Sequence, residues 1–278
     1  MKLQAYLDRI GYEGRVEPTL ECLRQVHRRQ ALSVPYENLD VQLGTPLDLD
    51  IDRIFDKVVG RRRGGWCYEV NGLLGWALAE IGFDVTRAAG GVLRAERGDA
   101  ALGNHLILLV RLDRDYLADL GSGDGIREPI PVQSGAYQQG ALEFRLEEMA
   151  DGYWRFHNHS FAHPPSFDFR ASLADEALLA AKCNALQTMP ESTFVQNLVC
   201  QIMAHETVTC LTGRVLRHKS GEGNSKALIS SCGELVQTLD EVFGIRNVDV
   251  SLLWPKLVAR HELLFGDKPI DQITFAGM

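Results

Sequence analysis

One cysteine, Cys67, stands where a glycine-containing segment leads into an apolar segment of helical periodicity. Residues 63–71 read Arg-Gly-Gly-Trp-Cys-Tyr-Glu-Val-Asn, and apolar side chains then recur at helical spacing as far as Ile81. The unpaired N–H groups and the positive dipole end of a helix N-terminus favour thiolate over thiol and can form an oxyanion hole. Gly64 and Gly65 would let a bulky thioester approach the sulfur. Cys67 is therefore predicted to be a nucleophile, with a buried structural thiol as the alternative.

A histidine and an aspartate follow at positions suited to support a thiolate. An imidazolium holds a thiolate at neutral pH, and a carboxylate can orient the imidazolium. His105 begins the apolar run 105–110, which is typical of a buried strand. Burial of an ionisable ring costs free energy, so a histidine there is expected to have a functional role. Asp119 lies in the next β-rich run, 116–120, just before a glycine-rich turn. We predict that Cys67, His105 and Asp119 form a catalytic triad.

The triad requires one particular hairpin between these two runs. Directly opposed residues of an antiparallel pair share a face, and their numbers have a constant sum. A three-residue loop at 112–114 would place Asp119 opposite Ile107. Asp119 is then diagonal to His105, with the Cβ atoms about 7 Å apart. Because a two-residue loop would put the two side chains on opposite faces, we predict the three-residue loop.

The composition indicates a globular protein and excludes several functions. The chain has 278 residues, and 45% of them are hydrophobic, which is enough to form a core. Its formal net charge of −8 argues against a nucleic-acid partner, because phosphate binding needs clustered cations. Residues 1–9 lack the apolar core of a signal peptide, and no apolar run approaches the roughly 20 residues that cross a bilayer, so we expect no membrane partner. The six cysteines are scattered without a Cys-x-x-Cys pair and are predicted to be reduced thiols in the cytoplasm.

The apolar spacing along the chain changes twice, which predicts an α+β protein of three regions. Region 1–83 has helical spacing and would be a helical bundle that carries the cysteine. Region 84–190 would be a β-barrel that carries the histidine and the aspartate, and region 191–278 mixes helical and strand patterns. The β-rich runs of the second region lie at 85–93, 105–112, 116–120 and 153–156.

The C-terminal part of the chain alternates between the two patterns. Helices are predicted near 174–185 and 193–205, a strand over 207–216, a hairpin turn at 221–224, and further helices over 233–243 and 255–264. We expect these elements to cover the site and keep water away from it.

Several segments resemble, in order and spacing, those of the arylamine N-acetyltransferase family. They are Arg-Gly-Gly-Trp-Cys-Tyr at 63–68, Pro-Tyr-Glu-Asn-Leu-Asp at 35–40, the histidine heading the run 105–110, and Asp-Leu-Gly-Ser-Gly at 119–123. The resemblance covers nearly the whole chain. It implies the fold of that family, which is a helical bundle, a β-barrel and an α/β lid around a cysteine-proteinase-like Cys-His-Asp core.

The resemblance also implies an activity and the roles of single residues. The chain would transfer acetyl from acetyl-CoA, through a thioester on Cys67, to a small aromatic amine or hydrazine in a ping-pong reaction without a metal. Carried over by position, Tyr36 and Tyr68 would line the amine pocket. Glu37 and Arg63 would support the site. A cytoplasmic role in xenobiotic metabolism would follow.

The chain departs from the family at Ser122, where the family usually has Phe between two glycines. A hydroxymethyl group cannot stack on an aromatic amine as a phenyl ring does, so the substrate preference at this position stays open. For coenzyme A, the candidates are the backbone at Gly123 and the ring of Phe194. A plain turn and a core position are the respective alternatives.

Other interpretations remain open. A cysteine hydrolase of the papain or transglutaminase type shares the chain order Cys, His, Asp. A ligand-binding module without catalysis, or an amide synthase of the same family, would keep the fold. His157, His159 and His163 suggest a metal site, but Pro164 and Pro165 interrupt the strand that would align them, so we expect no metal. The oligomeric state is undetermined, with a homodimer as one alternative.

Overall fold

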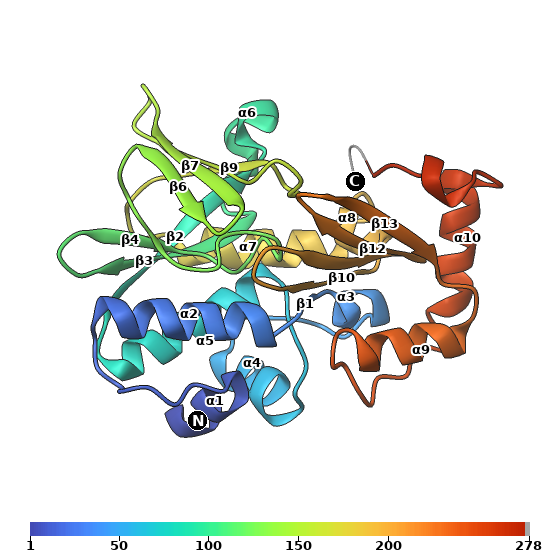
Figure 1. The fold of residues 1–278 in the computed structure, drawn as a ribbon, viewed down its shortest axis with the longest axis horizontal. Coiled ribbons are helices and arrows are strands. Elements are labelled where there is room, and N and C mark those ends of the chain that lie inside the picture. Colours follow the sequence, from blue (N-terminus) through green and yellow to red (C-terminus); the bar gives the residue numbers. More distant parts are fainter. Residues whose placement is uncertain (276–278) are drawn as a thin grey trace.

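The N-terminal part of the chain is a bundle of helices that packs against a curved sheet (Figure 1). The structure, a computed structural model, describes residues 1–275. The helices here are α1 (Leu3–Ile10), α2 (Leu20–Ser33), α3 (Leu39–Leu43), α4 (Ile51–Phe55), a π-helical turn (Asp56–Gly60) and α5 (Cys67–Ile81). Thr19 caps α2 by accepting a hydrogen bond from the N–H of Cys22 at 3.3 Å, and Gly82, with a φ of 103°, ends α5. The helices predicted before residue 83 are thus confirmed.

The middle of the chain forms an eight-stranded antiparallel sheet that curls towards closure (Figure 1). Its strands are β2 (Asp84–Val92), β3 (His105–Arg111), β4 (Asp115–Ala118), β5 (Ile130–Pro131), β6 (Gly135–Gln139), β7 (Leu142–Glu148), β8 (Trp154–His157) and β9 (Ser166–Phe169). In the order β5-β4-β3-β2-β9-β8-β7-β6, the strands β5 and β6 lie at opposite edges. Only residues 132–134 connect β5 to β6 along the chain. The two edges must therefore lie close together, which nearly closes the barrel.

The hairpin between β3 and β4 has the register that the triad requires. Arg111 pairs with Asp115, so the loop is 112–114 and the predicted three-residue loop is confirmed. Asp119 follows directly after β4 in this register. Its side chain therefore belongs on the same face of the sheet as His105.

The C-terminal part forms a second sheet, which a short strand from the helical bundle completes (Figure 1). Its elements are α7 (Glu176–Thr188), α8 (Thr193–Gln196), β10 (Val199–Met203), β11 (Val208–Thr212), β12 (Val215–Ser220), β13 (Gly223–Leu228), α9 (Cys232–Glu241), α10 (Trp254–Phe265) and a 3-10 turn (Ile270–Gln272). The strand order is β1-β10-β11-β12-β13, where β1 (Tyr36–Glu37) comes from the bundle. The combination of helices with two sheets confirms the predicted α+β fold class.

The helix predicted over 193–205 is wrong beyond Gln196, because the chain continues as strand β10. A tertiary contact is the reason. The side chain of Asn38 donates to the carbonyl of Phe194 at 2.9 Å and accepts from the N–H of Val199 at 2.7 Å. These bonds satisfy backbone groups at the end of α8 and at the start of the strand, which the local sequence pattern does not reveal.

The single strand predicted over 207–216 is in fact two strands, β11 and β12, joined by a tight turn. Thr212 pairs with Val215, and Gly213 in the turn has a φ of 56°. Glycine adopts this left-handed backbone conformation without strain, so the chain reverses here. The hairpin predicted at 221–224 is confirmed, because β12 and β13 pair across it.

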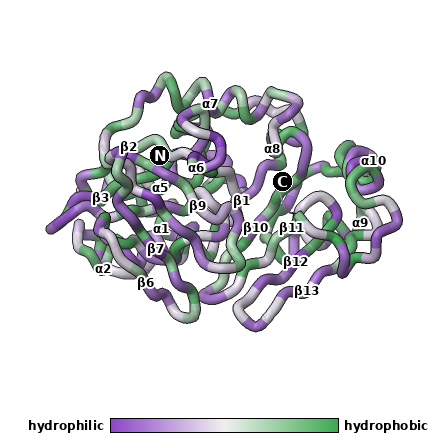
Figure 2. The backbone as a smooth tube through the Cα atoms, turned by 90° about the horizontal axis from the view of Figure 1, so that it is seen from above, coloured by the Kyte–Doolittle hydropathy of each residue, from purple (hydrophilic) through white to green (hydrophobic). Residues whose placement is uncertain are grey.

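The free edge of the second sheet is polar. Figure 2 shows the hairpin that ends in β13 mostly in purple and white, and most residues of this strand are exposed. A short polar edge strand resists pairing with other chains. Within residues 1–275, no helix is long and apolar enough to span a membrane.

Candidate active site

Cys67 is the first residue of α5 and is buried. The first intrahelical hydrogen bonds run from the N–H groups of Glu69 and Val70 to the carbonyl of Trp66, at 2.9 Å each. The N–H groups of Cys67 and Tyr68 come before these bonds and point out of the N-terminus of the helix. The sulfur therefore lies in the positive field of the helix dipole, as the sequence pattern predicted.

The contacts of the two glycines before the cysteine differ from the expectation. A Cβ atom on Gly64 would lie 2.0 Å from the carbonyl oxygen of Pro35, and one on Gly65 would lie 2.7 Å from the Cβ of Glu69. Neither glycine is among the described residues that line the cavity at the sulfur. The small size of Gly64 and Gly65 lets neighbouring segments of the protein pack closely. The contacts of the two glycines do not indicate that a thioester substrate approaches the sulfur past them.

His105 and Asp119 lie side by side, each only 2% exposed. The Nε2 atom of His105 lies 3.1 Å from both carboxylate oxygens of Asp119. Because an ionised carboxylate only accepts hydrogen bonds, Nε2 carries a proton and donates it. Cys67 lines the same cavity as His105. The structure thus places the imidazole next to the carboxylate and in the neighbourhood of the sulfur.

The electrostatics of this group favour a protonated histidine. Burial by itself would lower the pKa of His105, but the charge of Asp119, its hydrogen bond to the ring and the nearby side chain of Cys67 raise that pKa to about 10. Burial would raise the pKa of Asp119, but the charge of His105 outweighs burial and lowers it. At neutral pH the ring is therefore an imidazolium, which is the partner that a thiolate requires.

Asn71, one helical turn after the cysteine, holds the aspartate in place. Its Nδ2 atom donates to Asp119 Oδ1 at 2.7 Å and to the carbonyl of Leu106 at 2.6 Å. Its Oδ1 atom accepts from the N–H of Leu120 at 2.9 Å. The helix that carries Cys67 thereby also positions the carboxylate. This role was missed from the sequence, although the four-residue spacing from Cys67 to Asn71 puts both on one helix face.

Gly121 touches both the cysteine and the histidine. A Cβ atom at this position would lie 2.7 Å from the Cβ of Cys67 and 2.7 Å from the Cε1 of His105. A side chain does not fit into such distances, so the two groups can approach one another because residue 121 is a glycine. From the sequence, Gly121 was assigned only to a turn.

Glu37 and Arg63 belong to a buried cluster of charged side chains behind the cysteine. Its members are Glu37, Asp40, Lys57, Arg63 and Glu69. Arg63 Nε donates to Glu37 Oε1 at 2.9 Å, and Lys57 Nζ donates to both carboxylate oxygens of Glu69 at 2.9 and 3.0 Å. Burial alone would lower the pKa of Lys57, but the surrounding carboxylates raise it. Glu69 also accepts from the N–H of Trp66 at 3.2 Å, so the cluster anchors the start of α5.

A cavity of about 450 Å³ opens at the sulfur. Cys67 and His105 form part of its wall, together with residues of α6 (Arg94–Arg97), the 3-10 turn (Gly98–Ala101), α7, α8 and β10. Three predicted ligand contacts line it, namely Tyr36, Ser122 and Phe194. A cavity of this size can hold a small aromatic molecule.

Tyr68 and Gly123, the other two predicted ligand contacts, are not among the described residues that line this cavity. Tyr68 is fully buried, and its hydroxyl donates to the carbonyl of Gly103 at 2.7 Å. A Cβ atom on Gly123 would lie 2.1 Å from Gln201 Oε1 and 2.9 Å from the Cβ of Tyr36. Both residues are therefore engaged in packing within the protein.

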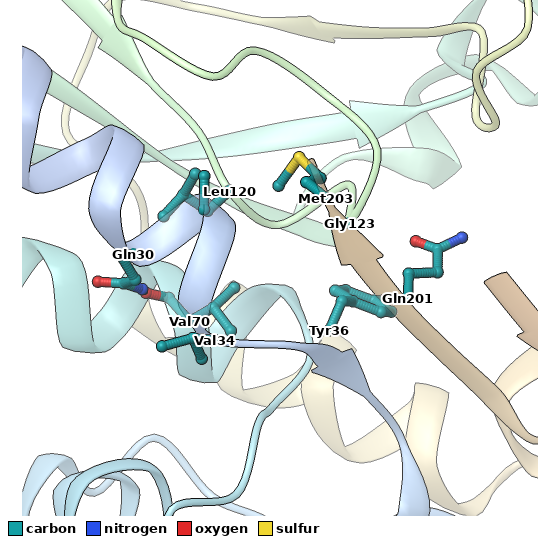
Figure 3. Close-up of a pocket in the computed structure, with 9 residues that line it drawn as sticks. Gln30, Val34, Tyr36, Val70, Leu120, Gly123, Gln201 and Met203 are labelled. Carbon is teal, nitrogen blue, oxygen red and sulfur yellow. The ribbon is translucent and has the colours of Figure 1, made fainter. Parts of the chain in front are cut away.

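A second, much smaller cavity adjoins the first, and Tyr36 and Gln201 line both (Figure 3). Its volume of about 10 Å³ is close to the minimum for one water molecule. Apolar side chains such as Val34, Val70 and Leu120 surround it in Figure 3. Because an organic substrate does not fit there, the larger cavity is the candidate active site.

The sequence is similar to characterised enzymes over most of its length. A family model described as N-acetyltransferase matches residues 19–252. The arylamine N-acetyltransferase of Mycobacterium tuberculosis is 34% identical over 259 residues, which cover 90% of this chain and 91% of that protein. Arylamine N-acetyltransferase 1 of Homo sapiens is 35% identical over 245 residues, which cover 79% of this chain and 83% of that protein.

Solved structures agree with this similarity. The structure of Mycobacterium marinum arylamine N-acetyltransferase in complex with CoA matches with a TM-score of 0.82 at 31% identity, over 93% of this chain and 98% of that one. The arylamine N-acetyltransferase of Salmonella typhimurium matches with a TM-score of 0.81 at 26% identity, over 94% of this chain and 98% of that one. The shared fold therefore includes the bundle, the barrel and the second sheet.

Proposed function

This chain belongs to the arylamine N-acetyltransferase family, and on that premise we propose that Cys67 carries the acetyl group from one substrate to the other. The chain is an acyltransferase whose donor is acetyl-CoA and whose acceptor is an arylamine. The proposal for Cys67 is supported chiefly by one observation. The buried imidazole of His105, protonated at neutral pH, lies beside the carboxylate of Asp119 and lines the same cavity as Cys67.

In the first half-reaction, the thiolate of Cys67 attacks the carbonyl carbon of acetyl-CoA. The bond between that carbon and the sulfur of coenzyme A breaks, and the leaving thiolate takes the proton of the His105 imidazolium. The products are free coenzyme A and an acetyl thioester on Cys67. This step exchanges one thioester for another and is therefore nearly thermoneutral.

In the second half-reaction, the amine nitrogen attacks the acetyl carbonyl carbon on Cys67. The ring of His105, now neutral, accepts a proton from the nitrogen, and the sulfur leaves as a thiolate. Thiolate and imidazolium are restored, and the amide departs. The N–H groups of Cys67 and Tyr68 at the start of α5 are our candidates for the oxyanion hole, where one donor is worth about 3 kcal/mol in the barrier.

The direct test is the covalent intermediate. Acetyl-CoA added without an acceptor should leave one acetyl group on the intact protein, which peptide mapping by mass spectrometry should locate on Cys67. An arylamine added afterwards should remove the label as the N-acetyl product. A cysteine hydrolase would release acetate in the absence of amine, and a protein that only binds ligands would carry no label.

We propose that two cations at the rim of the cavity, Arg97 and Lys182, receive the phosphates of coenzyme A. Both side chains line the cavity at the side of α6 and α7, and Lys182 is half-buried with its Nζ donating to the carbonyl of Ala100 at 2.8 Å. Arg97→Ala and Lys182→Ala should each raise the KM for acetyl-CoA about fivefold to tenfold, because each removes a cation that faces an anionic substrate. Steady-state kinetics at low and high salt measure the effect, which salt should weaken.

A donor without phosphates provides the control for these variants. The KM for S-acetyl-N-acetylcysteamine, which has the same thioester group, should not change in either variant. Arg15→Ala, which alters an exposed arginine between α1 and α2, should behave as wild type with both donors. An equal loss with both donors would contradict a role for these cations in phosphate binding.

Ser122 is proposed to set the acceptor preference. It lines the cavity next to Gly121, and its hydroxyl has no hydrogen-bond partner within residues 1–275. Ser122→Phe would add a ring that can stack on an aromatic acceptor, a contact worth about 0.5–1.5 kcal/mol. We expect kcat/KM to change about twofold to tenfold among a panel of arylamines, while acetylation of Cys67 by acetyl-CoA persists.

Ser122→Ala separates the loss of the hydroxyl from the gain of a ring. It should leave the order of acceptors closer to wild type than Ser122→Phe does. Identical acceptor kinetics in wild type and Ser122→Phe would refute the proposed role.

Further features of the chain remain proposals. We divide the chain into a helical bundle over 1–83, a barrel over 84–190, and an interdomain helix with an α/β lid over 191–278. The bounds of the two sheets support this division, although β1 crosses it. A cysteine-proteinase-like core, a homodimer and a cytoplasmic location are likewise predictions, and the last is supported by six free cysteines.

A further inference from the structure

The loop after Asp119 forms one wall of the active site. Its residue Gly121 lies against both Cys67 and His105, and Ser122 lines the cavity. Movement of this loop would open the space between the acetyl thioester and solvent. The contacts that hold the loop therefore affect whether the amine or water reaches the acetyl thioester first.

Asp124, at the far side of this loop, is completely buried. Its carboxylate accepts a hydrogen bond from Lys219 Nζ, and its other oxygen lies 2.8 Å from His159 Nε2. Lys219 also donates to the carbonyl of Phe161 at 3.0 Å and is only 6% exposed. Burial would raise the pKa of Asp124, but the hydrogen bond from His159 and the charge of Lys219 lower it, so the carboxylate stays ionised.

Lys219 belongs to β12, an interior strand of the second sheet, and lies 95 positions away from Asp124 in the chain. Figure 1 shows this sheet beside the barrel. The ion pair thus joins the C-terminal sheet to the active-site loop. Arg127 makes a parallel connection, since its guanidinium donates to the carbonyls of Ala204 and Thr207 at 3.1 Å each.

The triad itself is held by different contacts. Asn71 on α5 binds Asp119 and the carbonyl of Leu106, and the sulfur is placed by the start of the same helix. These bonds connect the bundle with the barrel and do not involve Lys219. The N–H groups of Leu120 and Gly121 are bonded to Asn71 and Asp119, so these two residues stay with the triad. Displacement of residues 122–125 can therefore alter the cavity wall while the triad persists.

We propose that Lys219 is a positioning residue for the acceptor half-reaction, which acts through Asp124 to hold residues 122–125 beside the acetylated cysteine. This inference rests on the proposed thioester on Cys67. The residue touches neither substrate nor sulfur. Its effect appears in how the acetyl group is partitioned between amine and water.

Lys219→Met keeps the length of the side chain but removes its charge. We expect the KM for the arylamine, and the ratio of acetyl-CoA hydrolysis to amine acetylation, each to rise about 10-fold, because small displacements of a positioning loop are costly in rate. The rate of Cys67 acetylation and the pH profile of its alkylation by iodoacetamide should remain as in wild type. A contribution to folding stability alone would lower the melting temperature without changing the partition.

Matched variants separate the loss of the Lys219 charge from other effects of substitution. Lys219→Arg keeps a cation beside Asp124 and should restore most of the wild-type partition. Lys226→Met removes a lysine from the neighbouring strand β13, whose Nζ donates to the carbonyls of Asp271 and Ile273, and should have no effect on it. Asp124→Asn should reproduce Lys219→Met, and the double variant should add little to either, as expected of residues that act as a pair.

The outcomes distinguish this inference from the function on which it rests. If wild-type protein shows no acetyl label on Cys67, the proposed thioester fails. If the label forms, but folded Lys219→Met or Asp124→Asn partitions acetyl as wild type does, the positioning role is overturned. Should Lys219→Met not fold, Asp124→Asn and Lys219→Arg provide the same comparison.

Discussion

Cys67→Ala is expected to lower the rate of arylamine acetylation by about 10⁴-fold or more. Without the sulfur, no thioester can form, and the amine would have to attack acetyl-CoA directly. The imidazolium of His105 and the N–H groups at the start of α5 remain, but they have no nucleophile to assist. The measurement is the initial rate of N-acetyl product formation, together with the intact mass of the protein after incubation with acetyl-CoA. Neither product nor label should appear above the uncatalysed background.

Cys232→Ala is the matched control for this variant. Cys232 begins α9 and is more exposed than the other cysteines, so it is the thiol that a nonspecific acetylating agent would reach first. This variant should retain full activity and one acetyl label. A label that persists in Cys67→Ala and disappears in Cys232→Ala would show that the reactive thiol had been assigned incorrectly.

Asp119→Asn is expected to lower kcat/KM at pH 7 by about 10³-fold to 10⁴-fold. With Asp119 in place, the pKa of His105 is about 10, so the ring stays protonated as the pH rises until it approaches that value. In the variant, the charge of Asp119 that raises this pKa is gone, while burial, which lowers it, remains. The pKa of the ring therefore falls, and the cysteine has a weaker cationic partner at pH 7.

The pH dependence of alkylation by iodoacetamide measures this effect separately from substrate binding. Wild-type Cys67 should react rapidly at neutral pH, because the ring of His105 stays protonated until the pH approaches about 10. In Asp119→Asn, the rate at neutral pH should be much lower, because the ring has lost the charge that keeps it protonated. Asp113→Asn, which removes an exposed carboxylate from the loop of the same hairpin, should leave the wild-type profile intact. Overlapping profiles for wild type and Asp119→Asn would disprove the proposed ion pair.

Local pattern was sufficient to identify the residues at the centre of the site. The helix that begins at Cys67 and the strand that begins at His105 could both be predicted, because each depends on the spacing of neighbouring residues along the chain. The register of the β3–β4 hairpin could also be predicted, since the alternation of strand faces and the length of a short loop leave few choices. These features are local, and the sequence records local interactions directly.

The tertiary structure decided what lies around those residues. Strand β10 replaced part of a predicted helix because Asn38 binds backbone groups about 160 positions further along the chain. The need for glycine at 121 arises from three segments that meet at one point, and the tie between Asp124 and Lys219 joins two sheets. The spacing of residues carries no signal for such contacts, because segments far apart in the chain become neighbours only when the core has packed. The sequence by itself therefore determined the helix, the strand and the hairpin that carry the proposed reacting groups, and the tertiary packing determined what holds them and which side chains line the cavity.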